Sequence, residues 1–235
     1  ADEQLDTQRL NYLGHFFLNT GAAIDSVNAF ERLEARIPAH PEIMTAHARA
    51  LTEAGDYDAS ISLWERLAGT PGAGDIRFQH LLSKALAGDI DGTLDILGND
   101  GNMFAELIVE LHQRDMLRPA LQVARRATAL FPTEPQAWNY RGVLSAALGD
   151  SADAVACYEK ALALGGPDPD ILANLGAIQA SSGNTAAALA TLDRVLLARP
   201  DDIRVLRQYV DCTRLGADDD VYKALVRLSG SDALS

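Results

Sequence analysis

The feature that most constrains this chain is a recurrence at an interval of 34 residues. Three consecutive blocks, 101–134, 135–168 and 169–202, align in one register without a gap. The twentieth residue of each block is small in all three: Ala120, Ala154 and Ala188. A strict period of this length is typical of repeat architectures, in which each unit packs only on its neighbours.

The same frame extends towards the N-terminus. Block 7–40 fits in full, and block 41–73 is one residue short. Block 74–100 has only 27 residues, and the missing part belongs to its second helix. We expect that helix at about 90–97, with a change of curvature between a front portion, 7–73, and a back portion, 101–202.

Each block is predicted to be a helix–turn–helix unit. The pairs Gly149-Asp150 and Gly183-Asn184 interrupt the apolar periodicity, and Gly followed by a capping residue is typical of a helix end and a new start. Gly142 and Gly176, each the eighth residue of its block, allow the two helices to approach closely. Neither helix buries its apolar face alone, so the blocks must stack around one continuous core.

The pattern resembles the tetratricopeptide repeat, a 34-residue helix–turn–helix unit. Block 135–168 carries the resemblance most clearly, through Trp138, Gly142, Ala154 and Tyr158, although Arg141 and Ser145 stand where Leu and Tyr are usual. The resemblance implies an all-α fold, a right-handed superhelical α-solenoid of about six helix–turn–helix units plus C-terminal capping helices. We expect one domain over 1–235, with the cap at 203–229.

The cap is expected to contain two helices. The first begins at about residue 203, and the acidic run before Val221 is suited to the N-terminus of the second. Val221, Leu225 and Leu228 follow at helical spacing.

Composition narrows the classes of partner. With 33 acidic and 20 basic residues the net charge is −13, which disfavours a nucleic-acid partner. No apolar run is long enough to cross a bilayer, so we expect a soluble protein without membrane insertion, in the cytoplasm or the periplasm. The first residue is Ala, which leaves open a processed product and an excised piece of a longer chain.

The sequence offers no recognisable catalytic or metal-binding motif. The five histidines form no ligand pair, and the Gly-rich segment 69–75 lacks the Lys of a phosphate-binding loop. Segment 97–102 does not place carboxylates as a calcium loop does. Cys157 and Cys212 lie within apolar helical patterns and are expected to be buried thiols. We predict a non-catalytic chain with no cofactor and no metal.

Function is therefore expected on a surface. In proteins that resemble this family, the first helices line the concave face and hold a partner segment, extended or helical. Amide side chains there can hydrogen-bond the main chain of a peptide. Small apolar residues leave room for small side chains of the peptide, and arginines can bind a carboxylate. The acidic envelope favours partner segments with some basic residues. The predicted binding residues are Gln136, Asn139, Tyr140, Val143, Asn174, Ala177, Arg204, Arg207 and Gln208.

Three functions remain open at this point. The leading one is a protein–protein interaction scaffold that binds a peptide or partner segment. The second is the repeat region of a larger enzyme, because 215–235 is similar to the segment that joins such repeats to a bacterial sulfotransferase domain. The third is self-association through an exposed end of the solenoid. A clamp for a C-terminal carboxylate is disfavoured, since the first blocks lack the required Lys.

Overall fold

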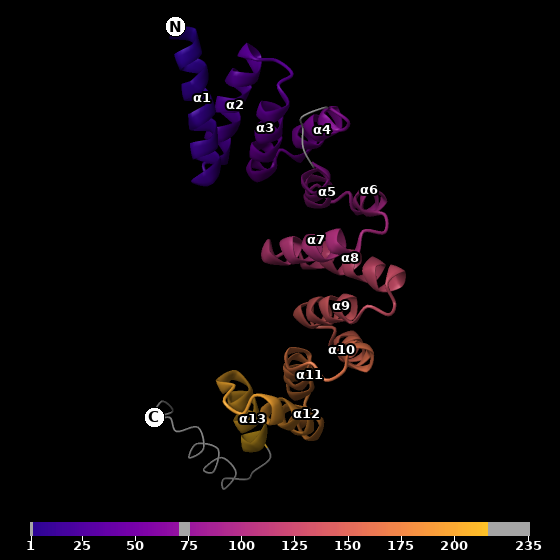
Figure 1. The fold of residues 1–235 in the computed structure, drawn as a ribbon. Helices are drawn as coiled ribbons and strands as arrows, with labels where there is room; N and C mark the ends of the chain where they lie inside the picture. Colours follow the sequence, from indigo (N-terminus) through magenta and orange to yellow (C-terminus); the bar gives the residue numbers. More distant parts are fainter. Residues whose placement is uncertain (1, 71–75, 216–235) are drawn as a thin grey trace, which may run out of the picture. The chain divides into compact units, whose positions relative to one another are not determined.

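The computed structural model describes residues 2–70 and 76–215, and in these ranges every regular element is an α-helix (Figure 1). The chain divides into two compact units, residues 1–103 and 104–235. The helices are α1 (Asp2–Asn19), α2 (Ala23–Arg36), α3 (Pro41–Ala54), α4 (Tyr57–Leu67), α5 (Arg77–Leu86), α6 (Ile90–Leu97), α7 (Gly101–Gln113), α8 (Leu117–Leu130), α9 (Pro135–Ala147), α10 (Ser151–Gly165), α11 (Pro169–Ser181), α12 (Thr185–Ala198) and α13 (Ile203–Leu215).

The predicted all-α solenoid class is confirmed. Within each unit consecutive helices pack on one another, as α1 does on α2 and α2 on α3, and as α9 does on α10 and α10 on α11. The second half of the predicted cap, from residue 216, lies outside the described residues. The single-domain assignment and the change of curvature at 74–100 stay predictions.

Glycine in the left-handed region ends first helices, and an aspartate starts the next helix. Gly55 has φ 84° and Gly149 has φ 82°, backbone angles that Gly adopts without the steric cost of a side chain. Asp56 and Asp150 follow directly, and their carboxylates accept the free amide hydrogens of the new helices. The Gly-Asp pairs of the sequence are therefore a helix stop and a helix start in two residues.

Close approach within a repeat depends on a glycine that faces a large side chain. A Cβ on Gly14 would lie 2.7 Å from the Phe30 ring, and one on Gly142 would lie 2.7 Å from the Tyr158 ring. These pairs hold the eighth and twenty-fourth places of their repeats. In block 101–134 the sizes are exchanged: Ile108 is the large residue and Ala124 the small one, and both are buried. The space between the two helices is still filled, but here the large side chain comes from the first helix and the small one from the second.

The twentieth residue differs between the units. In the first two repeats it is a buried serine whose hydroxyl donates to a backbone carbonyl of the first helix: Ser26 to Gly14 O at 2.8 Å, and Ser60 to Ala48 O at 2.9 Å. In the second unit Ala154 and Ala188 occupy this place and are fully buried. The first two repeats thus link their paired helices with hydrogen bonds as well as by packing.

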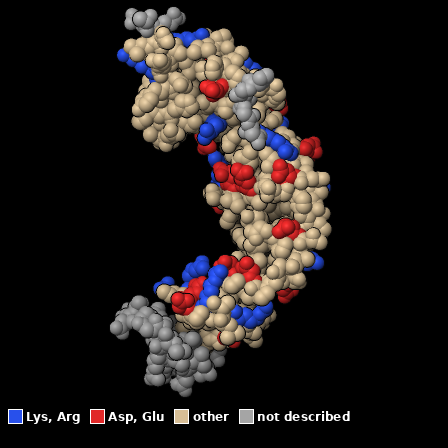
Figure 2. All heavy atoms as spheres, viewed as in Figure 1, with Lys and Arg blue, Asp and Glu red and all other residues tan. Residues whose placement is uncertain are grey.

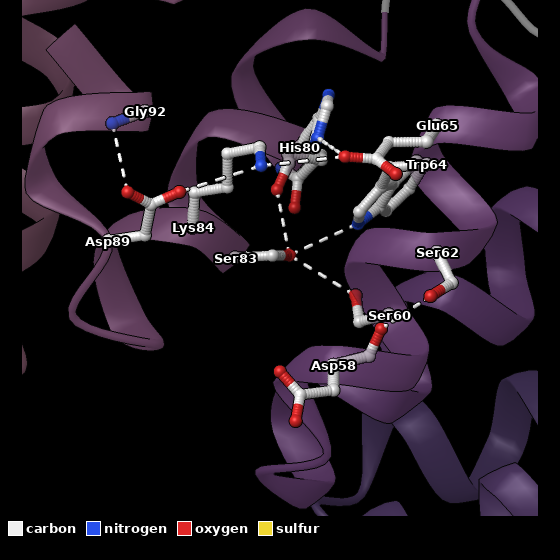
Figure 3. Close-up of polar contacts among 11 residues, drawn as sticks. Asp58, Ser60, Ser62, Trp64, Glu65, His80, Ser83, Lys84, Asp89 and Gly92 are labelled. Carbon is white, nitrogen blue, oxygen red and sulfur yellow. Dashed lines mark hydrogen bonds and ion pairs between the residues drawn. The ribbon is translucent and has the colours of Figure 1, made fainter.

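Ser60 is also part of a buried hydroxyl cluster that joins α3, α4 and α5. The Thr52 and Ser60 oxygens are 2.7 Å apart, and Ser83 lies 2.8 Å from Thr52 and 3.2 Å from Ser60. The Trp64 indole donates to Ser83 at 3.1 Å, as Figure 3 shows. Because directional bonds among buried groups tolerate little displacement, this cluster fixes the register of α5 on the preceding repeat.

Arg77 caps the C-terminus of the short helix α6, at the point where the second helices of other repeats continue for further turns. Its Nη2 donates to the carbonyls of Ile96 at 2.7 Å and Leu97 at 3.1 Å, and its guanidinium lies 3.5 Å from the Asp100 carboxylate. A cation at a helix C-terminus donates hydrogen bonds to unpaired carbonyls and interacts favourably with the negative end of the helix dipole. In the other repeats this fourth position holds an apolar residue, such as Met44.

Candidate partner-binding face

The first helices of the last repeats form a continuous series in the second unit. Helix α11 contacts both α9 and α13, while α10 and α12 supply the second helices. The core beneath this series is apolar: Leu172, Leu192 and Val205 are buried in one cluster that reaches α13. The series is called the first-helix face below, and all nine predicted binding residues lie on its helices.

The predicted residues fall into two groups by exposure. Four are solvent-exposed: Gln136, Asn174, Arg204 and Arg207. The other five are half-buried: Asn139, Tyr140, Val143, Ala177 and Gln208. The face therefore combines exposed polar side chains with half-buried side chains that are mostly apolar.

Two amides of this face have unsatisfied atoms. Asn139 Oδ1 and Gln208 Oε1 are shielded from solvent, and neither has a hydrogen-bond partner in the described structure. A buried polar atom without a partner costs free energy, on the order of 1–3 kcal/mol. Because both oxygens are shielded, they are not open to a ligand in this conformation of the face.

The arginines at the α13 end differ in what holds them. Arg204 lies 3.5 Å from the Asp202 carboxylate, which also accepts the Arg204 and Val205 amides at the start of α13. The Arg204 side chain is nonetheless largely exposed. Arg207 is exposed on the next turn. Both guanidinium groups are accessible to a carboxylate.

A half-buried ion pair positions α9 against α10. The Arg141 Nε donates to Asp153 Oδ2 at 3.2 Å, and the Ser145 hydroxyl donates to the same oxygen at 2.6 Å. Burial opposes ionisation of Asp153, but the hydrogen bonds from Arg141 and Ser145 outweigh it and lower the pKa of this carboxyl. The Arg141 guanidinium also lies 5.7 Å from the centre of the Trp138 ring.

This ion pair explains two departures from the repeat pattern that sequence reasoning noted without a role. Arg141 and Ser145 replace the usual apolar residues because both contact Asp153 of the second helix. The available signal was the coincidence of an Arg, a Ser and an Asp in one repeat at positions that face each other. In the next repeat Gln179 stands at the place of Ser145, and it accepts a neutral hydrogen bond from Thr191 at 2.8 Å.

The cysteines and the metal-ligating residue types were also compared across residues 2–70 and 76–215. Cys157 and Cys212 are buried and free, as the sequence indicated, and burial raises the pKa of the Cys157 thiol to about 11. Among the residues with described placement, no group of three His, Cys, Asp or Glu side chains is arranged to hold a metal ion. Within the same ranges no helix combines the length and apolar character needed to cross a membrane.

Charged side chains of both signs are spread over the two units. Figure 2 shows acidic and basic groups scattered among uncharged ones. Some are paired across repeats, as Arg199 is with Asp170 at 2.7 Å. The electrostatic attraction of the chain for a partner therefore comes mainly from its net charge of −13.

Comparison with known proteins identifies the type of repeat in the second unit. Residues 110–169 and 145–207 match tetratricopeptide-repeat profiles. Human protein O-mannosyl-transferase TMTC1 is 27% identical over 177 residues, which cover 69% of this chain and 20% of that protein. The chain thus spans a fifth of the length of this curated relative.

Two solved structures share the fold. A crystal structure of MamA superposes with a TM-score of 0.54 at 14% identity, covering 78% of this chain and 90% of that one. The C-terminal part of a TPR repeat-containing protein from Cytophaga hutchinsonii gives 0.55 at 13% identity, covering 96% of both chains. At these identities the likeness shows the fold alone.

Proposed function

We propose that the chain binds a partner segment on the first-helix face, because residues 110–169 and 145–207 belong to the tetratricopeptide-repeat family, whose repeats mediate protein–protein interactions. The observation that carries this proposal is the continuous series of first helices, which presents the exposed amides Gln136 and Asn174 beside half-buried side chains. Such amides bond the main chain of an extended segment whatever its side chains.

The surroundings of the amides define the ligand further. Tyr140, Val143 and Ala177 are half-buried and offer a shallow apolar floor, which suits modest apolar side chains. Arg204 and Arg207 at one end suit a carboxylate of the ligand, whereas the net charge of −13 favours basic residues elsewhere in it. The ligand class is therefore an extended segment with small apolar side chains, a few basic residues and an acidic group at one end.

A random peptide library panned on the purified chain tests this proposal. Peptides of the stated class are expected, and their affinity should fall about tenfold for Asn139→Ala or Asn174→Ala, a loss of about 1.4 kcal/mol. Gln122→Ala is the matched control, because Gln122 is an exposed amide on the second helix α8. Equal affinities for all three variants would remove the first-helix face as the site.

A second candidate function is favoured by the human transferase relative, of which the matched region is only 20%. The chain would then be the partner-binding repeat region of a larger enzyme, with the reaction carried out by residues outside it. The sulfotransferase connection stays a prediction. The reading frame on both sides of this segment decides the matter: a catalytic domain encoded in the same frame supports this candidate, and stop codons at both ends exclude it.

A further inference from the structure

Two histidines occupy the same place in successive repeats of the first unit. His47 on α3 and His80 on α5 each lie eight residues before a left-handed glycine that follows the first helix, Gly55 in one repeat and Gly88 in the other. Their side chains are only 10% and 14% exposed, and the Nε2 atoms of both are shielded without a hydrogen-bond partner. Each ring faces a glutamate on the second helix of the preceding repeat. A titratable group therefore lies at two equivalent helix contacts.

The two histidines differ in how that glutamate is placed. At α3, the His47 Nδ1 lies 2.8 Å from Oε2 of Glu34, a carboxylate that is itself mostly buried. At α5, the His80 Nε2 lies 4.0 Å from Glu65 Oε1, which is too long for a hydrogen bond, and the Glu65 side chain is 58% exposed. A proton added to His47 thus stays on a ring that bonds a carboxylate, whereas His80 has no such acceptor.

Lys84 holds the carboxylate that His80 lacks. Its Nζ lies 3.5 Å from the same Glu65 oxygen and 3.6 Å from Asp89 Oδ2, at the start of α6 (Figure 3). Lys84 follows His80 by four residues on α5, so a protonated His80 adds a second cation on the next turn, an unfavourable spacing for like charges. Among the described residues, Lys84 and Glu65 are the charged groups that act on the His80 ring, while the Arg77 guanidinium is bonded to carbonyls at the end of α6.

These surroundings favour the neutral form of His80. Burial and Lys84 lower the pKa of His80 below its ordinary value of 6.5, and Glu65 offsets this only in part. The unfolded chain therefore binds a proton at this residue more readily than the folded chain does. The stability that depends on neutral His80 is fully present above pH 6.5 and is lost as the pH falls from there through the lowered pKa.

We propose that His80 makes the packing of α5 on α4 sensitive to pH: protonation of its ring below neutral pH loosens this contact, while the packing of α3 on α2 holds. Ser83 lies between His80 and Lys84 in the sequence of α5. It accepts the hydrogen bond of the Trp64 indole from α4 and contacts the Thr52 hydroxyl of α3. The buried hydroxyl cluster therefore opens together with the α5 contact. The device uses no residue of the first-helix face, so its test is independent of peptide binding.

Hydrogen exchange of the full 235-residue chain, corrected for intrinsic exchange rates, tests the proposal between about pH 8 and about pH 5. The protection of the α5 amides is expected to fall severalfold on acidification, and that of the α3 amides to change less. His80→Gln keeps a neutral polar side chain and should abolish the acid loss at α5. His47→Gln is the matched control, at the equivalent place, and should retain that loss. Circular dichroism at the upper pH checks that both variants are folded.

Lys84→Gln supplies a second test that leaves the histidine in place. Without the cation, Glu65 is left to the ring, so the NMR titration of His80 should move to higher pH and the acid loss of α5 protection should shrink. In the parent chain His80 should titrate below pH 6.5. Titration at or above that value, α5 protection that does not change with pH, or an acid loss that persists in His80→Gln would each overturn the proposal.

Discussion

The first two repeats and the last two bring their paired helices together through different contacts. In repeats 7–40 and 41–73 a serine hydroxyl at the twentieth position bonds a carbonyl of the opposite helix. In repeats 135–168 and 169–202 that position is alanine, so the glycine under a large side chain, which repeat 7–40 also has, acts there without a serine bond. A hydrogen bond fixes the register of two helices, whereas a large side chain over a glycine fixes the distance between them.

The difference teaches where each unit places its cross-helix polar contacts. In the first unit they are in the core, as in the cluster of Thr52, Ser60 and Ser83. In the second unit the core contact is apolar, and the polar contact moves to the half-buried Arg141–Asp153 pair. If this division is right, replacing a polar contact by an apolar one, or the reverse, should change the free energy of unfolding by different amounts in the two units.

The largest effect is expected from Gly142 and Tyr158. Gly142→Ile should clash with the ring and Tyr158→Ala should leave a cavity, each with a loss of about 3 kcal/mol. The double variant reproduces the sizes of Ile108 and Ala124, so it should lose about 2 kcal/mol less than the sum of the singles. Urea unfolding measures all three. Strictly additive losses would show that the two residues do not pack as one pair.

The next effect concerns the ion pair of the second unit. Asp153→Ala leaves Arg141 half-buried without its partner and should destabilise the chain by about 2 kcal/mol, while Ser145→Ala should cost about 1 kcal/mol. Urea unfolding of the three proteins checks the order. A smaller loss for Asp153→Ala than for Ser145→Ala contradicts the central role of the carboxylate.

The same pair predicts a dependence of stability on pH. The pKa of Asp153 is lowered in the folded chain from an ordinary value of 3.8. Its contribution is therefore fully present above that value and is lost as the pH falls from there through the lowered pKa. Asp153→Asn should flatten this part of the profile relative to the parent chain, measured as the free energy of unfolding between pH 5 and the acid limit of folding.

A smaller effect separates the serines from the alanines. Ser26→Ala should cost about 1 kcal/mol, because the hydroxyl bonds the Gly14 carbonyl in the core. The reverse change, Ala154→Ser, should alter stability by no more than about 0.5 kcal/mol if the new hydroxyl finds the Gly142 carbonyl. Thermal unfolding of both variants checks this. A larger loss for Ala154→Ser means that the second unit has no room for the hydroxyl.

The smallest effect is expected at the short helix of the first unit. Arg77 is about half exposed, so Arg77→Leu should weaken the capping of α6 by only about 0.5 kcal/mol. Hydrogen exchange of the Gly98 amide, which bonds Leu94 O, reports the opening of this end. Unchanged exchange at Gly98 would show that the guanidinium does not hold the α6 terminus.

Much of the fold was predictable because the period and the Gly-Asp pairs act locally. Gly149 and Asp150 end one helix and begin the next whatever surrounds them, and a fixed interval repeats the same contacts. The sequence indicated close approach at Gly142 but not which side chain covers it. That choice depends on the rotation of the second helix, which brings Tyr158 over the glycine.

The candidate site was less predictable than the fold. Repeat position placed Asn139 and Gln208 on the first helices, but it gave no information about which polar atoms are shielded and left without partners. Arg77 was missed for another reason. Its role follows from what is absent beside it, two turns of helix, and a pattern of residue types reports only what is present.

The central claim, that a partner segment lies on the first-helix face, is tested most directly by site-specific photocrosslinking. A photoreactive phenylalanine analogue replaces Asn174 on α11 in one variant and Gln122 on α8 in another; both positions are exposed. With a peptide selected on the parent chain, we predict efficient crosslinking from position 174 and none from position 122. Crosslinking from position 122 alone would contradict the account.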